Sequence, residues 1–117
     1  MEYTTNKVLV QMDMQDKLKS ANVEEIIEII VKLCFQRGKM WVIAKDFLIK
    51  VKDGMRAGDS KFLAKKYHMK LVTFYYLRRK LIDMGLIEKK YGVYFLSSRF
   101  SEYMLSLSDA WDLVRRS

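Results

Sequence analysis

The chain has 117 residues, one cysteine, one histidine and a formal net charge of +8. This length suits one domain with a hydrophobic core, and the composition excludes an internal disulfide and a zinc site built from Cys and His. Residues 59–100 hold ten basic and three acidic side chains, which is a charge of +7 on less than half of the chain. Such a concentration predicts a phosphate-bearing partner; the alternative is a solvated lysine surface.

The sequence also lacks the patterns of several other protein classes. Met1 opens onto polar residues without the apolar segment of a signal peptide, and no apolar run is long enough to span a bilayer. No glycine-rich phosphate loop, nucleophile elbow or metal-ligand spacing is present. We therefore expect an intracellular, cytoplasmic protein that is not an enzyme, contacts no membrane and needs no cofactor.

The first half of the chain contains one clear helix and one ambiguous segment. Residues 1–21 form an N-terminal arm, which either orders against a partner subunit or is a frayed terminus. Asn22 and Glu25 form a capping box, so a helix should run from residue 22 to about 37. Its apolar stripe is broad enough for a central core helix, with Cys34 buried in it. Residues 40–52 favour a helix, although the run at 41–43 also suits a strand, and residues 53–58 read as a loop.

Residues 59–99 contain a denser set of signals. Asp59 or Ser60 can cap a short helix, and residues 67–69 form a turn. Phe74, Leu77 and Leu81 then recur at helical spacing in a second helix. Gly85 ends that helix, because glycine tolerates a positive φ. A hairpin with its turn at residues 91–92 follows.

These residues resemble a known family. The run LAKKYHMKLVTFYYLRRKLIDMGLI followed by EKKYGVYFLS is similar to the winged helix-turn-helix of MarR-like and related prokaryotic and archaeal regulators. The matching features, in order, are Leu63-Ala64, Met69, Thr73-Phe74, Gly85-Leu86-Ile87 and the aromatic hairpin. His68 stands where the family usually has glycine, and Lys70 stands where it usually has a capping Ser or Thr.

The resemblance implies a mainly α fold with a small β-hairpin. Residues 22–99 would form the winged helix-turn-helix domain, with an insertion at about residues 39–58 and additional N- and C-terminal helices. The family reads double-stranded DNA with the second helix of the motif. The positions that match its DNA-contacting residues are Lys70, Val72, Thr73, Tyr76, Arg79 and Lys80.

Helical geometry gives a related set without the resemblance. With Phe74 facing the core, a period of about 100° per residue turns Val72, Tyr75, Tyr76 and Arg79 outward. Arg can bind guanine, Thr and Tyr can bind phosphates, and Val can contact a thymine methyl group. A protein-facing aromatic patch at Tyr75-Tyr76 is the alternative. The full predicted DNA-binding set is Lys70, Val72, Thr73, Tyr75, Tyr76, Arg79, Lys80, Lys89, Lys90 and Arg99.

A last helix should follow a cap at Ser97 or Ser98 and span residues 100–117. Its apolar residues repeat at spacings of 4, 3, 4 and 3, as in a coiled-coil seam. This seam either completes the core or forms a homodimer interface, which we favour because symmetric DNA half-sites need a symmetric protein. The predicted interface residues are Phe100, Met104, Leu107, Trp111 and Val114.

The sequence thus predicts sequence-specific binding of double-stranded DNA by a dimeric transcription regulator of the nucleoid. One alternative is a winged-helix protein–protein module in a replication or transcription assembly. Another is a nonspecific, chromatin-type DNA binder. The target sequence, the direction of regulation and any small-molecule effector stay open.

Overall fold

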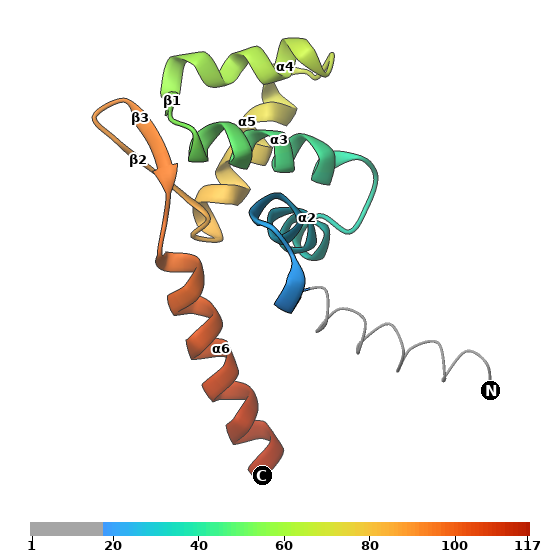
Figure 1. The fold of residues 1–117 in the computed structure, drawn as a ribbon, viewed down its shortest axis with the longest axis vertical. Helices are drawn as coiled ribbons and strands as arrows, with labels where there is room; N and C mark the ends of the chain where they lie inside the picture. Colours follow the sequence, from blue (N-terminus) through green and yellow to red (C-terminus); the bar gives the residue numbers. More distant parts are fainter. Residues whose placement is uncertain (1–17) are drawn as a thin grey trace, which may run out of the picture.

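A computed structural model describes residues 18–117 of the protein. Most of the predicted N-terminal arm, residues 1–17, lies outside the described residues. The elements follow in the order α2 (Val23–Cys34), α3 (Met40–Lys52), β1 (Met55–Arg56), η1 (Ala57–Lys61), α4 (Phe62–Lys66), α5 (Leu71–Asp83), β2 (Ile87–Lys90), β3 (Val93–Leu96) and α6 (Arg99–Arg116) (Figure 1). The described chain is mainly helical with a small antiparallel sheet, so the predicted fold class is confirmed at this level.

The sheet has three strands in the order β1-β3-β2. The predicted hairpin is β2–β3, in which Ile87 pairs with Leu96 and Lys90 with Val93. Tyr91 and Gly92 close it with φ values of 52° and 73°, which makes a tight turn that glycine favours. The sequence did not predict β1, which pairs with the other edge of β3.

The core lies between α3, α5 and β3. The Phe47 ring on α3 stacks on Phe74 of α5 at 5.7 Å, and its other neighbour is the edge of Tyr94 on β3 at 5.6 Å. All three side chains are buried. Residues 39–58, interpreted above as an insertion, therefore supply the central helix of the core and the third strand of the sheet. The helical interpretation of residues 40–52 is confirmed by α3.

The helix α2 forms where the capping box placed it, because the Asn22 side chain accepts a hydrogen bond from the Glu25 amide at 2.9 Å. The prediction that it is the central core helix is wrong. Only Ile27 and Val31 of α2 are buried, because residues 18–117 pack their core against one side of α2 alone. Cys34, expected to be buried in this helix, is half-buried, and burial raises the pKa of its thiol.

The segment between β1 and α5 differs locally from expectation. Neither Asp59 nor Ser60 caps α4; instead residues 57–61 form a 3-10 turn, and the Ser60 hydroxyl donates to the Ala57 carbonyl at 2.7 Å. His68 has a φ of 51°, the turn conformation for which glycine is usual. The helix α5 then begins at Leu71 and ends at Asp83.

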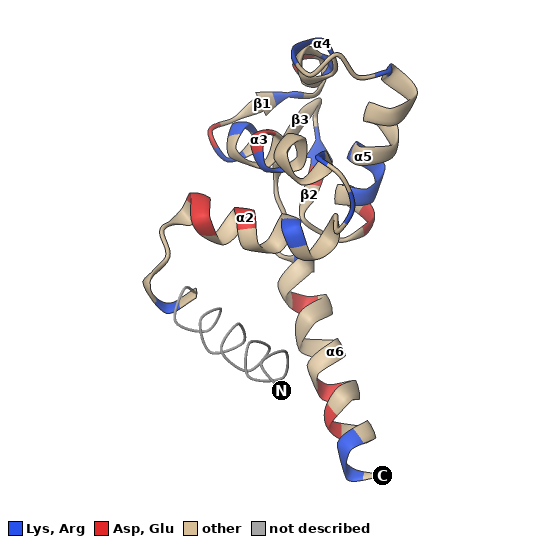
Figure 2. Cartoon of the chain, turned by 90° about the vertical axis from the view of Figure 1, so that its right-hand side faces the viewer, with Lys and Arg blue, Asp and Glu red and all other residues tan. Residues whose placement is uncertain are grey.

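The C-terminal helix α6 projects from the body of the protein (Figures 1 and 2). It has no buried residue, and only Phe100, at its base, packs partly against the core. The N-cap position is Ser98, whose side chain makes no capping hydrogen bond, and the preceding Ser97 hydroxyl accepts a hydrogen bond from the Arg99 amide at 3.1 Å. The alternative that α6 completes the core is therefore wrong for the helix beyond Phe100. No helix in residues 18–117 combines the length and the apolar character needed to cross a membrane.

Candidate functional site

The outer face of α5 is the first part of the candidate site. Phe74, Leu77 and Leu81 are fully buried and hold the helix against α3 and the sheet. Val72 and Tyr76 lie on the opposite side, in the first two turns of the helix. Their side chains are 72% and 64% exposed. A helix that is fixed by one face and open on the other can present its outer side chains to a large partner.

Arg79 also lies on this outer face and is exposed, but its side chain is paired with an acidic residue. The Arg79 Nε atom lies 3.2 Å from an Asp83 carboxylate oxygen, one turn further along the helix. An ion pair this exposed contributes little to stability, so the guanidinium can exchange Asp83 for another acceptor at small cost. The sequence analysis had not weighed Asp83, although its spacing from Arg79 is visible in the sequence.

Tyr75 and Lys80 do not lie on the open face. The Arg78 guanidinium covers the Tyr75 ring at 4.6 Å, and the other neighbour of that ring is Phe74. The Lys80 ammonium donates to the Cys34 carbonyl at 3.0 Å and lies 4.5 Å from the centre of the Phe35 ring. A lysine there satisfies a carbonyl at the negative end of α2. Lys80 thus joins α5 to α2.

Thr73 and Lys70 lie near the start of α5. Thr73 is half-buried, whereas Lys70 is exposed in extended conformation as the residue that precedes the helix. No side chain caps this helix start, so its first amide groups have no side-chain partner within the described chain. Lys70 is the predicted site residue closest to these amides.

The hairpin supplies the second part of the site. Lys89 and Lys90 are exposed on β2, next to Tyr91, which is 100% exposed at the tip. Arg99 lies at the base instead, where its Nε is 3.6 Å from a Glu88 carboxylate oxygen. The predicted basic residues of the hairpin are therefore divided between a free tip and a paired base.

Two further lysines belong near this site and were missed by the sequence analysis. Lys61 and Lys65 are exposed around α4, and their spacing of four residues on a helix was the available signal. Within residues 18–117, five exposed lysines of the basic region have no hydrogen bond or ion pair. They are Lys61, Lys65, Lys70, Lys89 and Lys90.

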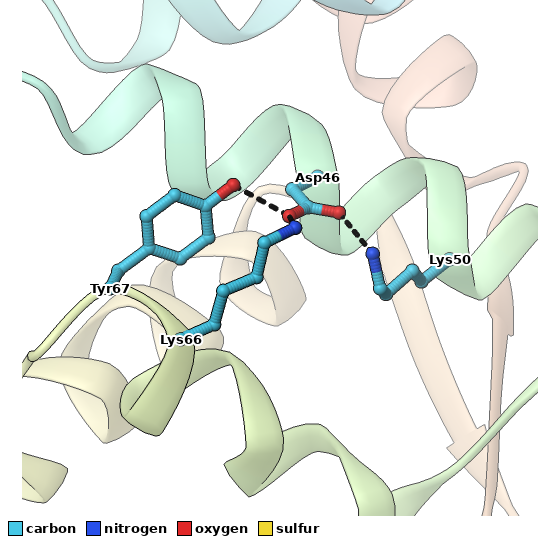
Figure 3. A network of polar contacts seen from close by, with 4 residues as sticks. All are labelled: Asp46, Lys50, Lys66 and Tyr67. Carbon is cyan, nitrogen blue, oxygen red and sulfur yellow. Dashed lines mark hydrogen bonds and ion pairs between the residues drawn. The ribbon is translucent and has the colours of Figure 1, made fainter.

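A carboxylate cluster sets the position of α4 and its turn. Asp46 of α3 accepts hydrogen bonds from Lys50 at 2.5 Å, Lys66 at 2.7 Å and the Tyr67 hydroxyl at 2.6 Å (Figure 3). Burial alone would raise the pKa of Asp46, but the three donors outweigh it and lower this pKa to about 2. The bond to Asp46 raises the pKa of Tyr67. Asp46 thus stays ionised and holds α4 and the turn after it against α3.

An open groove of about 1130 Å³ lies beside α4. Its apolar lining includes Met55, Met69 and the exposed side chains of Phe62 and Leu71. Lys61 and Lys65 also line it, so the groove adjoins the basic side of the site. In residues 18–117 no group of three or more His, Cys, Asp or Glu side chains is placed to hold a metal ion.

The comparisons bear on the extent of this architecture. The model of an archaeal family matches residues 23–115, which run from the start of α2 nearly to the end of α6. The chain belongs to this archaeal family. Because the match includes α2 and α6, the region shared by the family contains both of these helices as well as the body of the fold. Comparison with curated proteins and with solved structures found no match.

Proposed function

We propose that the protein is a winged helix-turn-helix protein that binds double-stranded DNA. In this interpretation α4 and α5 form the helix-turn-helix, β2–β3 forms the wing, and α5 enters the major groove. The helix α3 and the strand β1 then belong to the domain itself, and α2 is the additional helix. This revises the view of residues 39–58 as an insertion.

The position of the free lysines is the observation that carries the proposal. Three of them surround α4 and the start of α5, and two lie at the hairpin tip. Both groups lie at the end of the molecule away from α6 (Figure 1). The exposed face of α5 belongs to the same part of the fold. Lysines without an acidic partner gain most from phosphates, because binding releases counterions from the DNA.

The roles within the site follow from exposure and chemistry. Arg79 and Tyr76 would contact base edges, since an Arg can donate two hydrogen bonds to one guanine. Lys70, Lys89 and Lys90 would contact phosphates, which orient a protein on the duplex without reading its sequence. The proposed role is that of a transcription regulator inside the cell, for which Arg79 would supply sequence preference.

A homodimer is part of the proposal. The seam of α6 is exposed beyond Phe100, with Trp111 at 60% exposure and Leu107 at 62%. Apolar surface of this extent on one helix is typical of an interaction site. Two α6 seams packed together would cover it.

A protein partner is the second candidate, and the groove beside α4 favours it. Phe62 lines this groove and is 54% exposed. Exposed aromatic side chains beside lysines are suited to binding an acidic peptide. In that case the protein would be a module of a replication or transcription assembly. The test below separates the two candidates.

The test is fluorescence anisotropy on a random-sequence duplex across a salt series. We expect binding that weakens steeply with salt, and the Lys89→Ala/Lys90→Ala variant should reduce the salt slope by about two units. The matched control, Lys19→Ala/Lys39→Ala, removes two exposed lysines outside the site and should leave the slope nearly unchanged. Equal slopes for both variants would contradict the proposal and favour the protein partner.

A further inference from the structure

The helix α2 carries a second apolar face that the described chain leaves uncovered. A period of about 100° per residue turns Ile26, Ile29 and Leu33 roughly 120–180° away from the buried pair Ile27 and Val31. Leu33 is 56% exposed, and Ile26 and Ile29 are half-buried without packing against the core cluster. We call Ile26, Ile29 and Leu33 the outer face of α2.

The helix α6 also has an apolar face that the described chain leaves uncovered. Its exposed seam lies on a helix of 18 residues, which is about 27 Å long. The seam is flanked by the small side chains of Ser101, Ser108 and Ala110, which allow another helix to come close. In Figures 1 and 2, α2 lies at the same end of the body as the point where α6 projects from it.

The charges at the two surfaces are complementary. The first turn of α2 carries Glu24 and Glu25, and neither has an ion-pair partner among residues 18–117. The last turn of α6 ends in Arg115 and Arg116. Arg115 is paired with Asp112 of its own helix, whereas Arg116 has no partner in the described chain.

We infer that two copies of the chain associate through four helices, with α6 of each copy lying across the outer face of α2 of the other. For the end of one α6 to reach the place where the other α6 leaves its body, the two α6 helices must run antiparallel. Arg115 and Arg116 then lie beside Glu24 and Glu25 of the partner subunit. A second copy of the chain would cover both apolar surfaces and would pair the charges at both, so we assign it as the occupant of the outer face of α2 and of the α6 seam. The inference rests on the dimer proposed above and gives it a second surface.

The first experiment measures the mass of the full-length protein by sedimentation equilibrium in the absence of DNA. Leu33→Glu places a charge on the outer face of α2 and should raise the dimer dissociation constant at least tenfold, because an unpaired charge is costly in an apolar interface. The matched control is Leu105→Glu, which changes an exposed leucine of α6 outside the seam and should leave the constant unchanged. Circular dichroism checks that both variants are folded.

The second experiment exchanges the charges between the two helices. The variants Glu24→Arg/Glu25→Arg and Arg115→Glu/Arg116→Glu should each dimerise more weakly than the natural chain. When the two variants are mixed in equal amounts, each α6 meets an α2 of opposite charge, so the mixed dimer should outnumber the two homodimers together at least threefold, whereas random pairing gives equal amounts. Native mass spectrometry of one size-tagged variant with the other measures this ratio.

Each outcome decides a different point. A natural chain that is monomeric at all concentrations overturns both the inference and the proposed dimer, without touching DNA binding. A dimer that tolerates Leu33→Glu and pairs at random overturns the inference alone. The outer face of α2 would then have another occupant, either residues 1–17 or an unrelated protein. If Leu33→Glu fails to fold, the mixing ratio decides.

Discussion

The helices α5 and α6 carry similar apolar patterns but have opposite surroundings. In α5, Phe74, Leu77 and Leu81 are completely buried, whereas α6 exposes Leu107 and Trp111 and buries no residue. The two helices differ in what lies opposite the apolar face: α3 and the sheet in one case, and nothing within the described chain in the other. An apolar stripe therefore predicts that a helix face will be covered, but it does not say whether the same chain covers it.

The largest loss of stability should come from a substitution in the buried core around α5. Phe74→Ala leaves a cavity beside Phe47 and should lower the free energy of unfolding by about 3–5 kcal/mol. Leu105→Ala, an exposed leucine of α6, should change it by less than about 0.5 kcal/mol. Urea titrations followed by circular dichroism measure both. Similar losses for the two variants would mean that α6 is part of the folded core.

The junction between the two regions comes next. Gly85 precedes β2 with a φ of 79°, and a Cβ atom there would lie 2.8 Å from the backbone nitrogen of Phe100. Gly85→Ala should therefore cost about 2–3 kcal/mol through strain and through displacement of the base of α6. Gly58→Ala is the control, because its Cβ would meet no atom within 4 Å. Equal denaturation midpoints for Gly85→Ala and Gly58→Ala would show that the base of α6 moves to accommodate the added Cβ atom without a loss of stability.

The smallest effect concerns Asp46, which ties α4 to α3, while no comparable cluster ties α6 to the body within residues 18–117. Its pKa falls from 3.8 to about 2 on folding. Its contribution to stability is therefore complete above pH 3.8 and is lost as the pH falls through about 2. Asp46→Asn should cost about 1–2 kcal/mol at pH 7.

Denaturation at several pH values tests this. The difference between the natural chain and Asp46→Asn should shrink between about pH 4 and pH 2. Asp53→Asn, at the end of the same helix and without a side-chain hydrogen bond in the described chain, should show no such change. A difference that stays constant with pH would mean that the charge of Asp46 is not what stabilises the junction.

Part of the candidate site could be placed from the sequence alone. Val72, Tyr76 and Arg79 face outward as predicted, because three buried residues define the rotation of a helix. Tyr75 and Lys80 could not be placed in this way, since the orientation of each depends on a neighbour from the fold. Arg78 covers Tyr75, and the end of α2 attracts Lys80.

The sequence by itself determined the local elements of this protein. The cap at Asn22, the helical period around Phe74 and the turn at Tyr91-Gly92 act over a few residues, so their signals can be read along the chain. Only the tertiary structure decided that α3 rather than α2 is central, and that β1 pairs with β3. A strand of two residues has no readable period, and the burial of an apolar face depends on which distant element packs against it.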